Sequence, residues 1–148
     1  MATIPPSEII HVGQIDIQFR VEAEQSGGAL TMFEYRIPPR ARVPIPHSHE
    51  TFDETVYGLD GVTAATVGGR KVSIERGDVL FIPRGIVHHI ENLGDADARG
   101  LSVVTPGVLG PDYFREVAAV LSAGGPPNLA LIAEVMRRHG LRPVPPAA

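Results

Sequence analysis

Two stretches of the sequence, residues 47–61 (HSHETFDETVYGLDG) and residues 77–92 (GDVLFIPRGIVHHIEN), decide the fold and the candidate site. His47 and His49 are separated by one residue, and Glu54 follows His49 after four intervening residues. Side chains alternate between the two faces of a strand, so the two histidines point the same way, roughly 7 Å apart along the chain. A carboxylate and a further histidine from neighbouring strands would complete a pocket of three histidines and one carboxylate. Neutral imidazole binds Zn, Cu, Fe and Ni, and a carboxylate extends this range to Mn, so the pattern predicts a metal site.

The same two stretches resemble the paired signature motifs of the cupin superfamily, and the resemblance covers about residues 28–106. The matching positions are His47, His49, Glu54 and Gly61 in the first motif, and Gly77, Pro83, Gly85, His88 and Asn92 in the second. One position departs, because a glycine usually stands six residues before the first histidine and this chain has Ala41 there. Glycine is favoured where the backbone needs a positive φ or passes close to another group. The departure therefore concerns the local turn and not the metal.

The resemblance implies an all-β fold, the double-sheet jelly-roll barrel, with a metal site inside it. The implied cofactor is one divalent transition metal per chain, either Fe, Mn, Ni, Cu or Zn, held by His47, His49, Glu54 and His88. Three histidines and one glutamate would leave about two positions of an octahedral ion for water, dioxygen or a chelating oxygen substrate. Glu54 could stay a ligand or dissociate and act as a general base, which makes it the candidate catalytic residue.

Short runs with strand-like alternation, separated by turns rich in glycine and proline, fill most of residues 9–105. The predicted strands are residues 9–22, 30–37, 55–59, 62–67, 71–74, 79–82, 86–91 and 100–105. Gly68-Gly69 predicts a hairpin turn, and Gly85 and Asn92 are expected to shape turns rather than to contact a substrate. Short strands at this spacing are typical of a sandwich or barrel.

The pattern changes to helical spacing after Pro106-Gly107. One helix is predicted from Pro111 through Leu121, and a second is predicted between a capping Asn128 and Gly140. Residues 142–148 are expected to form a loose tail. The expected organisation is a barrel over residues 1–106, with its motifs at 41–61 and 77–92, followed by a C-terminal helical extension and tail over residues 107–148.

Composition restricts the class of protein. The 148 residues are a one-domain length, and the chain has no cysteine, which excludes disulfides, thiolate ligands and thiol nucleophiles. A net charge of −4 without a Lys/Arg cluster argues against a nucleic-acid partner. No apolar stretch approaches the roughly 18 residues of a membrane span, and the N-terminus lacks the basic and apolar regions of a secretory signal. We therefore expect a cytoplasmic protein with a small-molecule substrate and no membrane partner.

Several assignments in the pocket depend on strand register. Asp53 competes with Glu54 as the carboxylate ligand, because a one-residue slip turns side chains to the other face of a strand. The count back from Gly61 favours Glu54. His89 and Tyr57 have the opposite parity to the proposed ligands and are expected to face outward. The candidates for the substrate pocket are Met32, Tyr35, Val56, Phe81 and Ile90.

Within the superfamily, the sequence resembles small single-barrel bacterial proteins described as quercetin dioxygenase-like. The similarity lies in the Asp53-Glu54-Thr55 run and in the helical extension near Phe114. It implies a metal-dependent dioxygenase-type oxidoreductase acting on a small oxygen-bearing substrate, aromatic molecules included. The alternatives are a non-catalytic cupin that binds a metal and a small ligand, or a cupin lyase or isomerase. The intact ligand set favours an enzyme.

A homodimer is also predicted, because jelly-roll sheets have open edges that need to be covered or paired. The strand around Ile15, Ile17 and Phe19 is expected to extend a partner's sheet. The apolar stripes of the two helices must be buried on their own barrel or on a neighbour's. The alternative is a monomer in which both helices fold back on their own barrel.

Overall fold

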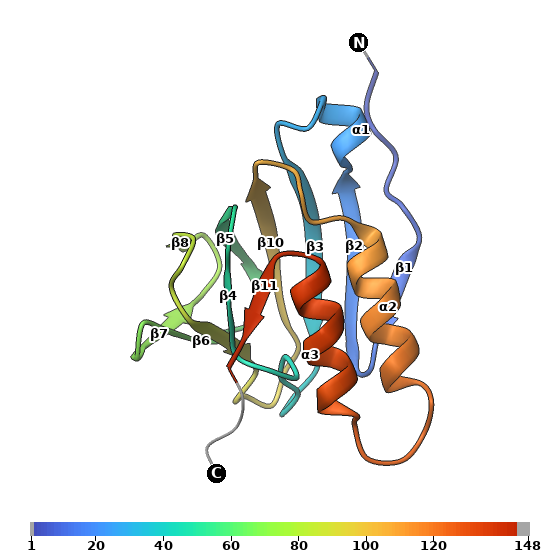
Figure 1. Cartoon of the computed structure of the whole chain (residues 1–148). Coiled ribbons are helices and arrows are strands. Elements are labelled where there is room, and N and C mark those ends of the chain that lie inside the picture. Colours follow the sequence, from blue (N-terminus) through green and yellow to red (C-terminus); the bar gives the residue numbers. More distant parts are fainter. Residues whose placement is uncertain (1, 145–148) are drawn as a thin grey trace.

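Two antiparallel sheets build the protein in a computed structural model that describes residues 2–144 (Figure 1). The six strands of the first sheet are β1 (Ile9–Val12), β2 (Ile15–Val21), β3 (Thr31–Ile37), β10 (Ala98–Thr105), β5 (Asp53–Asp60) and β8 (Val79–Ile82), in this spatial order. The five strands of the second sheet are β11 (Leu141–Pro143), β4 (His47–His49), β9 (His88–Glu91), β6 (Thr63–Val67) and β7 (Arg70–Ile74), again in spatial order. The predicted all-β jelly roll with C-terminal helices is confirmed.

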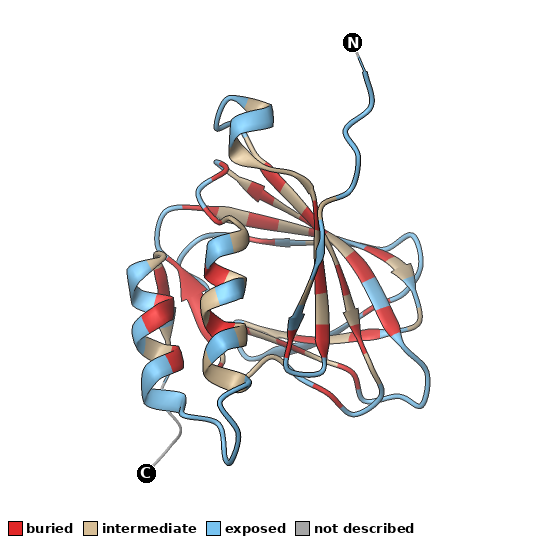
Figure 2. Ribbon diagram, turned by 90° about the vertical axis from the view of Figure 1, so that its right-hand side faces the viewer, coloured by how far each residue is buried: buried red, intermediate tan, exposed pale blue. Residues whose placement is uncertain are grey.

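Alternating side chains of the long strands build the core between the sheets, and Figure 2 shows buried and less buried residues alternating along them. Ile15, Ile17 and Phe19 of β2 are buried, and β3 continues the pattern across the ladder with Tyr35 opposite Ile17 and Phe33 opposite Phe19. Fully burying an aliphatic or phenylalanine side chain contributes about 1.5–3 kcal/mol. The alternation in the sequence is therefore sufficient to fix which face of this sheet turns inward.

The N-terminal segment differs from the prediction of one strand over residues 9–22. Gly13, with a φ of 61°, allows the chain to fold back, so β1 and β2 form a hairpin. A short helix, α1 (Ala23–Ser26), which the sequence reading missed, follows β2. Because β2 lies between β1 and β3 and its apolar side chains face the core, Ile15, Ile17 and Phe19 do not point toward a partner's sheet, contrary to our expectation.

The C-terminal extension contains the two predicted helices, α2 (Pro111–Leu121) and α3 (Leu129–Arg138). Asn128 caps α3, since its side chain accepts a hydrogen bond from the Leu131 backbone N–H at 3.2 Å. The buried side chains are Tyr113 and Val117 of α2 and Ile132, Val135 and Met136 of α3. α2 packs against β1 and α3, and α3 packs against β11, so both helices fold back on their own barrel. None of the helices within residues 2–144 has the length and apolar character needed to cross a bilayer.

The predicted loose tail is partly wrong. Leu141, Arg142 and Pro143 form β11, which pairs with β4 in the register Leu141 opposite His49 and Pro143 opposite His47. The chain thus returns from the helical extension to the strand that carries the first motif. Residues 145–148 lie outside the described part of the chain.

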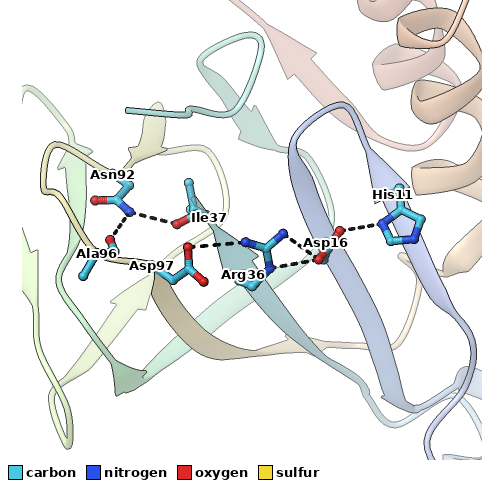
Figure 3. A network of polar contacts seen from close by, with 7 residues as sticks. All are labelled: His11, Asp16, Arg36, Ile37, Asn92, Ala96 and Asp97. Carbon is cyan, nitrogen blue, oxygen red and sulfur yellow. Dashed lines mark hydrogen bonds and ion pairs between the residues drawn. The ribbon is translucent and has the colours of Figure 1, made fainter. Parts of the chain in front are cut away.

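A polar network fixes the turn after β9 (Figure 3). Asn92 is 2% exposed, and its side-chain amide donates hydrogen bonds to the carbonyl oxygens of Ile37 and Ala96, both at 2.8 Å. Its Oδ1 accepts a hydrogen bond from the Gly94 backbone N–H at 2.9 Å. Both polar atoms of the buried amide group are therefore engaged, within the turn and with the end of β3, which is the structural role predicted for Asn92.

The same view shows a chain of ion pairs on the outer face of the six-stranded sheet (Figure 3). Arg36 bridges Asp16 at 2.8 Å and Asp97 at 3.3 Å, and His11 Nδ1 lies 2.6 Å from Asp16 Oδ1. Partly exposed pairs of this kind contribute little stability each. They identify this half of the outer face as a charged, solvated surface.

The turn that leads to the first motif accommodates the missing glycine. The Ala41 backbone N–H donates to the Pro38 carbonyl oxygen at 3.1 Å, which closes a four-residue turn. The positive φ of this turn, 68°, falls on Arg40 rather than on Ala41. Ala41 is buried and its carbonyl oxygen accepts from the Asn92 backbone N–H at 2.9 Å. Ala41 therefore occupies the usual glycine position without a left-handed backbone, and the positive φ of the turn is a separate feature of Arg40.

Candidate metal centre

The three histidines of the two motifs converge between the sheets. His47 and His49 lie on β4, and His88 lies on β9, directly opposite His47 in the ladder. All three are buried, and one ring nitrogen from each lies within 4.8 Å of the others. Alternation along β4 turns both of its histidines inward, as the spacing predicts. The cluster could hold a metal ion.

Hydrogen bonds orient two of these rings. His47 Nδ1 donates to the Ile45 carbonyl oxygen at 2.9 Å, and His88 Nδ1 donates to the Ile86 carbonyl oxygen at 3.1 Å. Such bonds fix the tautomer of a histidine and leave Nε2 free to bind a metal. His49 is held differently, because its ring stacks on Phe52 with the centroids 4.2 Å apart and its buried Nδ1 has no hydrogen-bond partner within residues 2–144.

Burial keeps the imidazoles of His47 and His49 neutral. Burial, with a further contribution from the neighbouring histidines, lowers the pKa of His47 to about 3 and that of His49 to about 2. Neutral imidazole is the form that ligates metals. The donor set therefore fits a transition metal without prior loss of a proton from these two rings at neutral pH.

Glu54 of β5 joins the histidines from the opposite sheet. Its Oε1 lies 3.8 Å from His49 Nε2 and 4.0 Å from His88 Nε2, which is too long for a hydrogen bond. Ligands at roughly 2.0–2.2 Å from one ion lie about 3–4 Å from each other. The Ser102 hydroxyl donates to Glu54 Oε2 at 2.8 Å and leaves Oε1 directed at the histidines. Burial raises the pKa of Glu54 above its ordinary value.

Asp53, the rival carboxylate, has a different partner. It accepts a hydrogen bond from the Arg84 backbone N–H at 2.8 Å and pairs with the Arg84 guanidinium at 3.0 Å. These contacts lower the pKa of Asp53. The structure therefore brings Glu54, and not Asp53, to the histidines. His89 also lies outside the cluster, with Nε2 at 2.8 Å from the Val43 carbonyl oxygen, and Tyr57 is exposed, as expected from parity.

The cluster opens into a cavity of about 90 Å³ with a mostly apolar lining. Of the five predicted pocket residues, only Tyr35 and Ile90 line it. Val56 is buried in the core away from the cavity, whereas Met32 and Phe81 have the parity of the outer face. The prediction was wrong for these three residues. Met32 has the opposite parity to Tyr35 on β3, whereas the positions of β5 and β8 relative to the cavity could not be determined from sequence.

Sequence reasoning missed the contribution of β2 and of the extension to this cavity. Ile15 and Ile17 of β2 line it, and so do Leu109, Tyr113, Phe114 and Leu141 from the segment beyond residue 106. The apolar alternation of residues 15–19 was a usable signal for β2. The helical residues gave no such signal, because an apolar stripe predicts burial without saying against what.

Comparison with known proteins identifies the family. Residues 33–104 match the family described as Cupin domain. The chain is 37% identical over 60 residues to the tetracenomycin polyketide synthase protein TcmJ of Streptomyces glaucescens, a match that covers 40% of each protein. It is 31% identical over 93 residues to the oxalate-binding protein of Thermotoga maritima, covering 62% of this chain and 76% of that protein. The chain belongs to the cupin superfamily.

A solved structure supports the same assignment. The crystal structure of a predicted oxalate decarboxylase from Thermotoga maritima superposes with a TM-score of 0.60 at 29% identity, over 70% of this chain and 93% of that chain. The family match ends at residue 104. The helical extension that closes the cavity therefore lies outside the matched domain.

Proposed function

We propose that the protein is a metal-dependent cupin enzyme, a dioxygenase-type oxidoreductase acting on a small oxygen-bearing substrate. One divalent transition metal would be held by His47, His49, His88 and Glu54. The observation that carries the proposal is the buried set of three histidines and one carboxylate that faces an apolar cavity. A bound divalent ion would supply Lewis-acid chemistry and, for the redox-active metals, one-electron chemistry with dioxygen.

The protein's own residues have separate tasks in this proposal. Ser102 holds one oxygen of Glu54, so the other oxygen can bind the ion or accept a proton from the substrate. Glu54 is the carboxylate placed to hold that proton, because its second oxygen faces the histidines. The apolar walls exclude water, which strengthens electrostatic interactions inside the cavity.

The size of the cavity supports a substrate of few atoms. Its volume of about 90 Å³ is smaller than the roughly 150 Å³ of an engineered protein cavity that binds benzene. A short organic acid fits this space better than an aromatic substrate. The polar atoms at the histidine end would receive the oxygens of such an acid, and the aliphatic walls would contact its carbon atoms.

The second candidate is a non-catalytic protein that binds a metal and a short acid. The small cavity favours it, together with the Thermotoga maritima relative that is described as an oxalate-binding protein. Ligand turnover separates the two candidates, since both require the same metal centre.

The test is to load the protein with Fe(II), Mn(II), Co(II) or Ni(II) and to measure dioxygen uptake with two- to four-carbon hydroxy and oxo acids. Substrate-dependent uptake that is lost in Glu54→Gln would support the oxidoreductase. Acid binding in equilibrium dialysis, without uptake or any new product, would support the binding protein. A folded protein that retains no metal would contradict both candidates.

We also propose that the protein acts as a cytoplasmic homodimer. An uncharged patch on the outer face of the six-stranded sheet supports the dimer: Tyr57, Val79 and Phe81 are 43%, 64% and 56% exposed, and Tyr57 pairs with Val79 in register. β8 is the outermost strand of this sheet, and uncharged side chains bring no like charges together across a two-fold axis.

Light scattering tests the dimer. A mass near twice the 15.8 kDa of one chain is expected, and Val79→Lys should reduce it to one chain. Val72→Lys, at an exposed position of the other sheet, is the matched control. A wild-type mass near one chain at micromolar concentration would contradict the proposal.

A further inference from the structure

The helical extension places one phenol in the wall of the cavity. Tyr113 lies in the first turn of α2, beyond the residues that match the family. Its side chain borders the same cavity as the histidines, and the residue is only 6% exposed. The other lining residues of the extension, Leu109, Phe114 and Leu141, are apolar. Tyr113 is therefore the polar group with which the extension faces the metal centre.

The hydroxyl of Tyr113 is unpaired, unlike that of the second phenol of the cavity. Tyr35 Oη lies 2.8 Å from Thr63 Oγ1 and is committed to that hydrogen bond. Tyr113 Oη has no hydrogen-bond partner within residues 2–144, yet it is not enclosed by protein atoms as the unpaired His49 Nδ1 is. Because the Tyr113 side chain lines the cavity, the cavity is where its hydroxyl would meet a ligand. A ligand that carries an acceptor oxygen could receive a hydrogen bond from this hydroxyl.

The ring of Tyr113 is held in place from two sides. Phe114 packs against it edge to face at 5.0 Å between centroids, and His139 does so at 5.5 Å. His139 is itself fixed by a contact with Glu116, which also pairs with Arg138 at 2.7 Å. The orientation of the phenol is therefore set by α2 and by the end of α3, before any ligand binds.

The charge state of Tyr113 makes it a donor. Burial, together with the negative charge of Glu54, raises the pKa of Tyr113 above its ordinary value. The hydroxyl consequently stays protonated at physiological pH and can donate a hydrogen bond.

We propose that Tyr113 is a specificity-determining residue that donates a hydrogen bond to the far end of a ligand held at the metal centre. The inference rests on the proposed metal site. The ligand would carry two oxygen groups on a short carbon chain, one for the metal and one acceptor for the phenol. Short dicarboxylates and 2-oxo acids have this chemistry, and a monocarboxylate such as formate lacks the second group.

The test uses Co(II)-loaded protein and two probes, oxalate and formate, with binding measured by calorimetry. In Tyr113→Phe, the Kd for oxalate should rise about tenfold, the worth of one hydrogen bond to a charged acceptor. The Kd for formate and the metal content should stay within twofold of wild type. Tyr57→Phe removes the same atom from an exposed tyrosine and is the matched control.

Three results would overturn the inference, and they separate it from the proposed function. Unchanged oxalate affinity in Tyr113→Phe would show that the phenol only packs, while the metal centre stands. Equal losses for oxalate and formate would indicate a general disturbance of the cavity and not recognition of a second oxygen group. A wild-type protein that holds no Co(II) would overturn the metal centre, and the inference with it.

Discussion

The barrel and the helical extension contribute different things to one cavity. The barrel strands β4, β5 and β9 supply the four candidate ligands, each turned inward by strand alternation. The extension supplies apolar walls and one unpaired phenol. Ligand geometry requires side chains fixed to within a fraction of an ångström, which paired strands provide. A helix docked on the barrel can change the shape of the cavity without moving those strands, so metal binding and ligand choice should be separable.

The largest effect expected from this comparison is at His49. Replacing His49 with Ala removes one of three candidate nitrogen ligands from a buried site and should abolish stoichiometric metal binding, measured by elemental analysis. Because the metal stabilises only the folded state, the variant should also lose the rise in melting temperature that metal gives the wild type. Full retention of metal in folded His49→Ala would mean that the ligand set is wrong.

The next largest effect tests whether metal binding is independent of the packing of the helical extension. Ile132 of α3 is fully buried, and Ile132→Ala should lower the free energy of unfolding by about 2–5 kcal/mol in chemical denaturation. The neighbouring Leu131 is exposed, so Leu131→Ala should change it by less than about 0.5 kcal/mol. Both folded variants should keep about one metal per chain.

Loss of metal in folded Ile132→Ala would contradict the expectation that metal binding does not depend on the extension. The route for such coupling is visible, because β11 runs from the end of α3 back to β4 and pairs Leu141 with His49. The extension would then hold the ligand strand in place as well as shape the cavity.

The sequence was sufficient for the barrel because its signals are local and periodic. His47 and His49 share a face by parity, and the alternation of β2 and β3 defines their buried sides without knowledge of any partner. The boundaries of β8 and α2 were also predictable, since glycine or proline bounds both segments.

The features that could not be predicted from the sequence depend on contacts between distant segments. Phe81 was misplaced because hydrophobicity does not say which face of a sheet is the inner one when the outer face is also apolar. Met32 has the opposite parity to Tyr35, so alternation along β3 was sufficient to exclude it. β11 was missed because Arg142 and Pro143 are poor strand residues, and only the open edge of β4 recruits them. Tyr113 was missed because only the fold brings the helix α2 to the cavity that contains the histidines.

A smaller effect tests the register of the carboxylate within the barrel. Glu54→Gln should weaken metal binding about tenfold or more, because it replaces a charged ligand with a neutral amide at a buried site. Asp53→Asn, which affects only the exposed pair with Arg84, should change the metal affinity less than twofold. Competition with a chromogenic chelator measures both. Equal losses would show that the two carboxylates contribute alike to the site.

The smallest effect concerns the turn by which the barrel enters its first motif. Arg40 adopts a φ of 68°, a conformation that costs most L-residues about 1–2 kcal/mol and that asparagine tolerates better. Arg40→Asn should therefore raise the free energy of unfolding by about 0.5–1 kcal/mol in chemical denaturation. The same substitution removes the exposed contact between Arg40 and Asp95, which Asp95→Asn removes without touching the turn. If Asp95→Asn leaves stability unchanged while Arg40→Asn raises it, the strain at the turn is real. An Arg40→Asn variant no more stable than wild type would show that the turn accommodates arginine without strain.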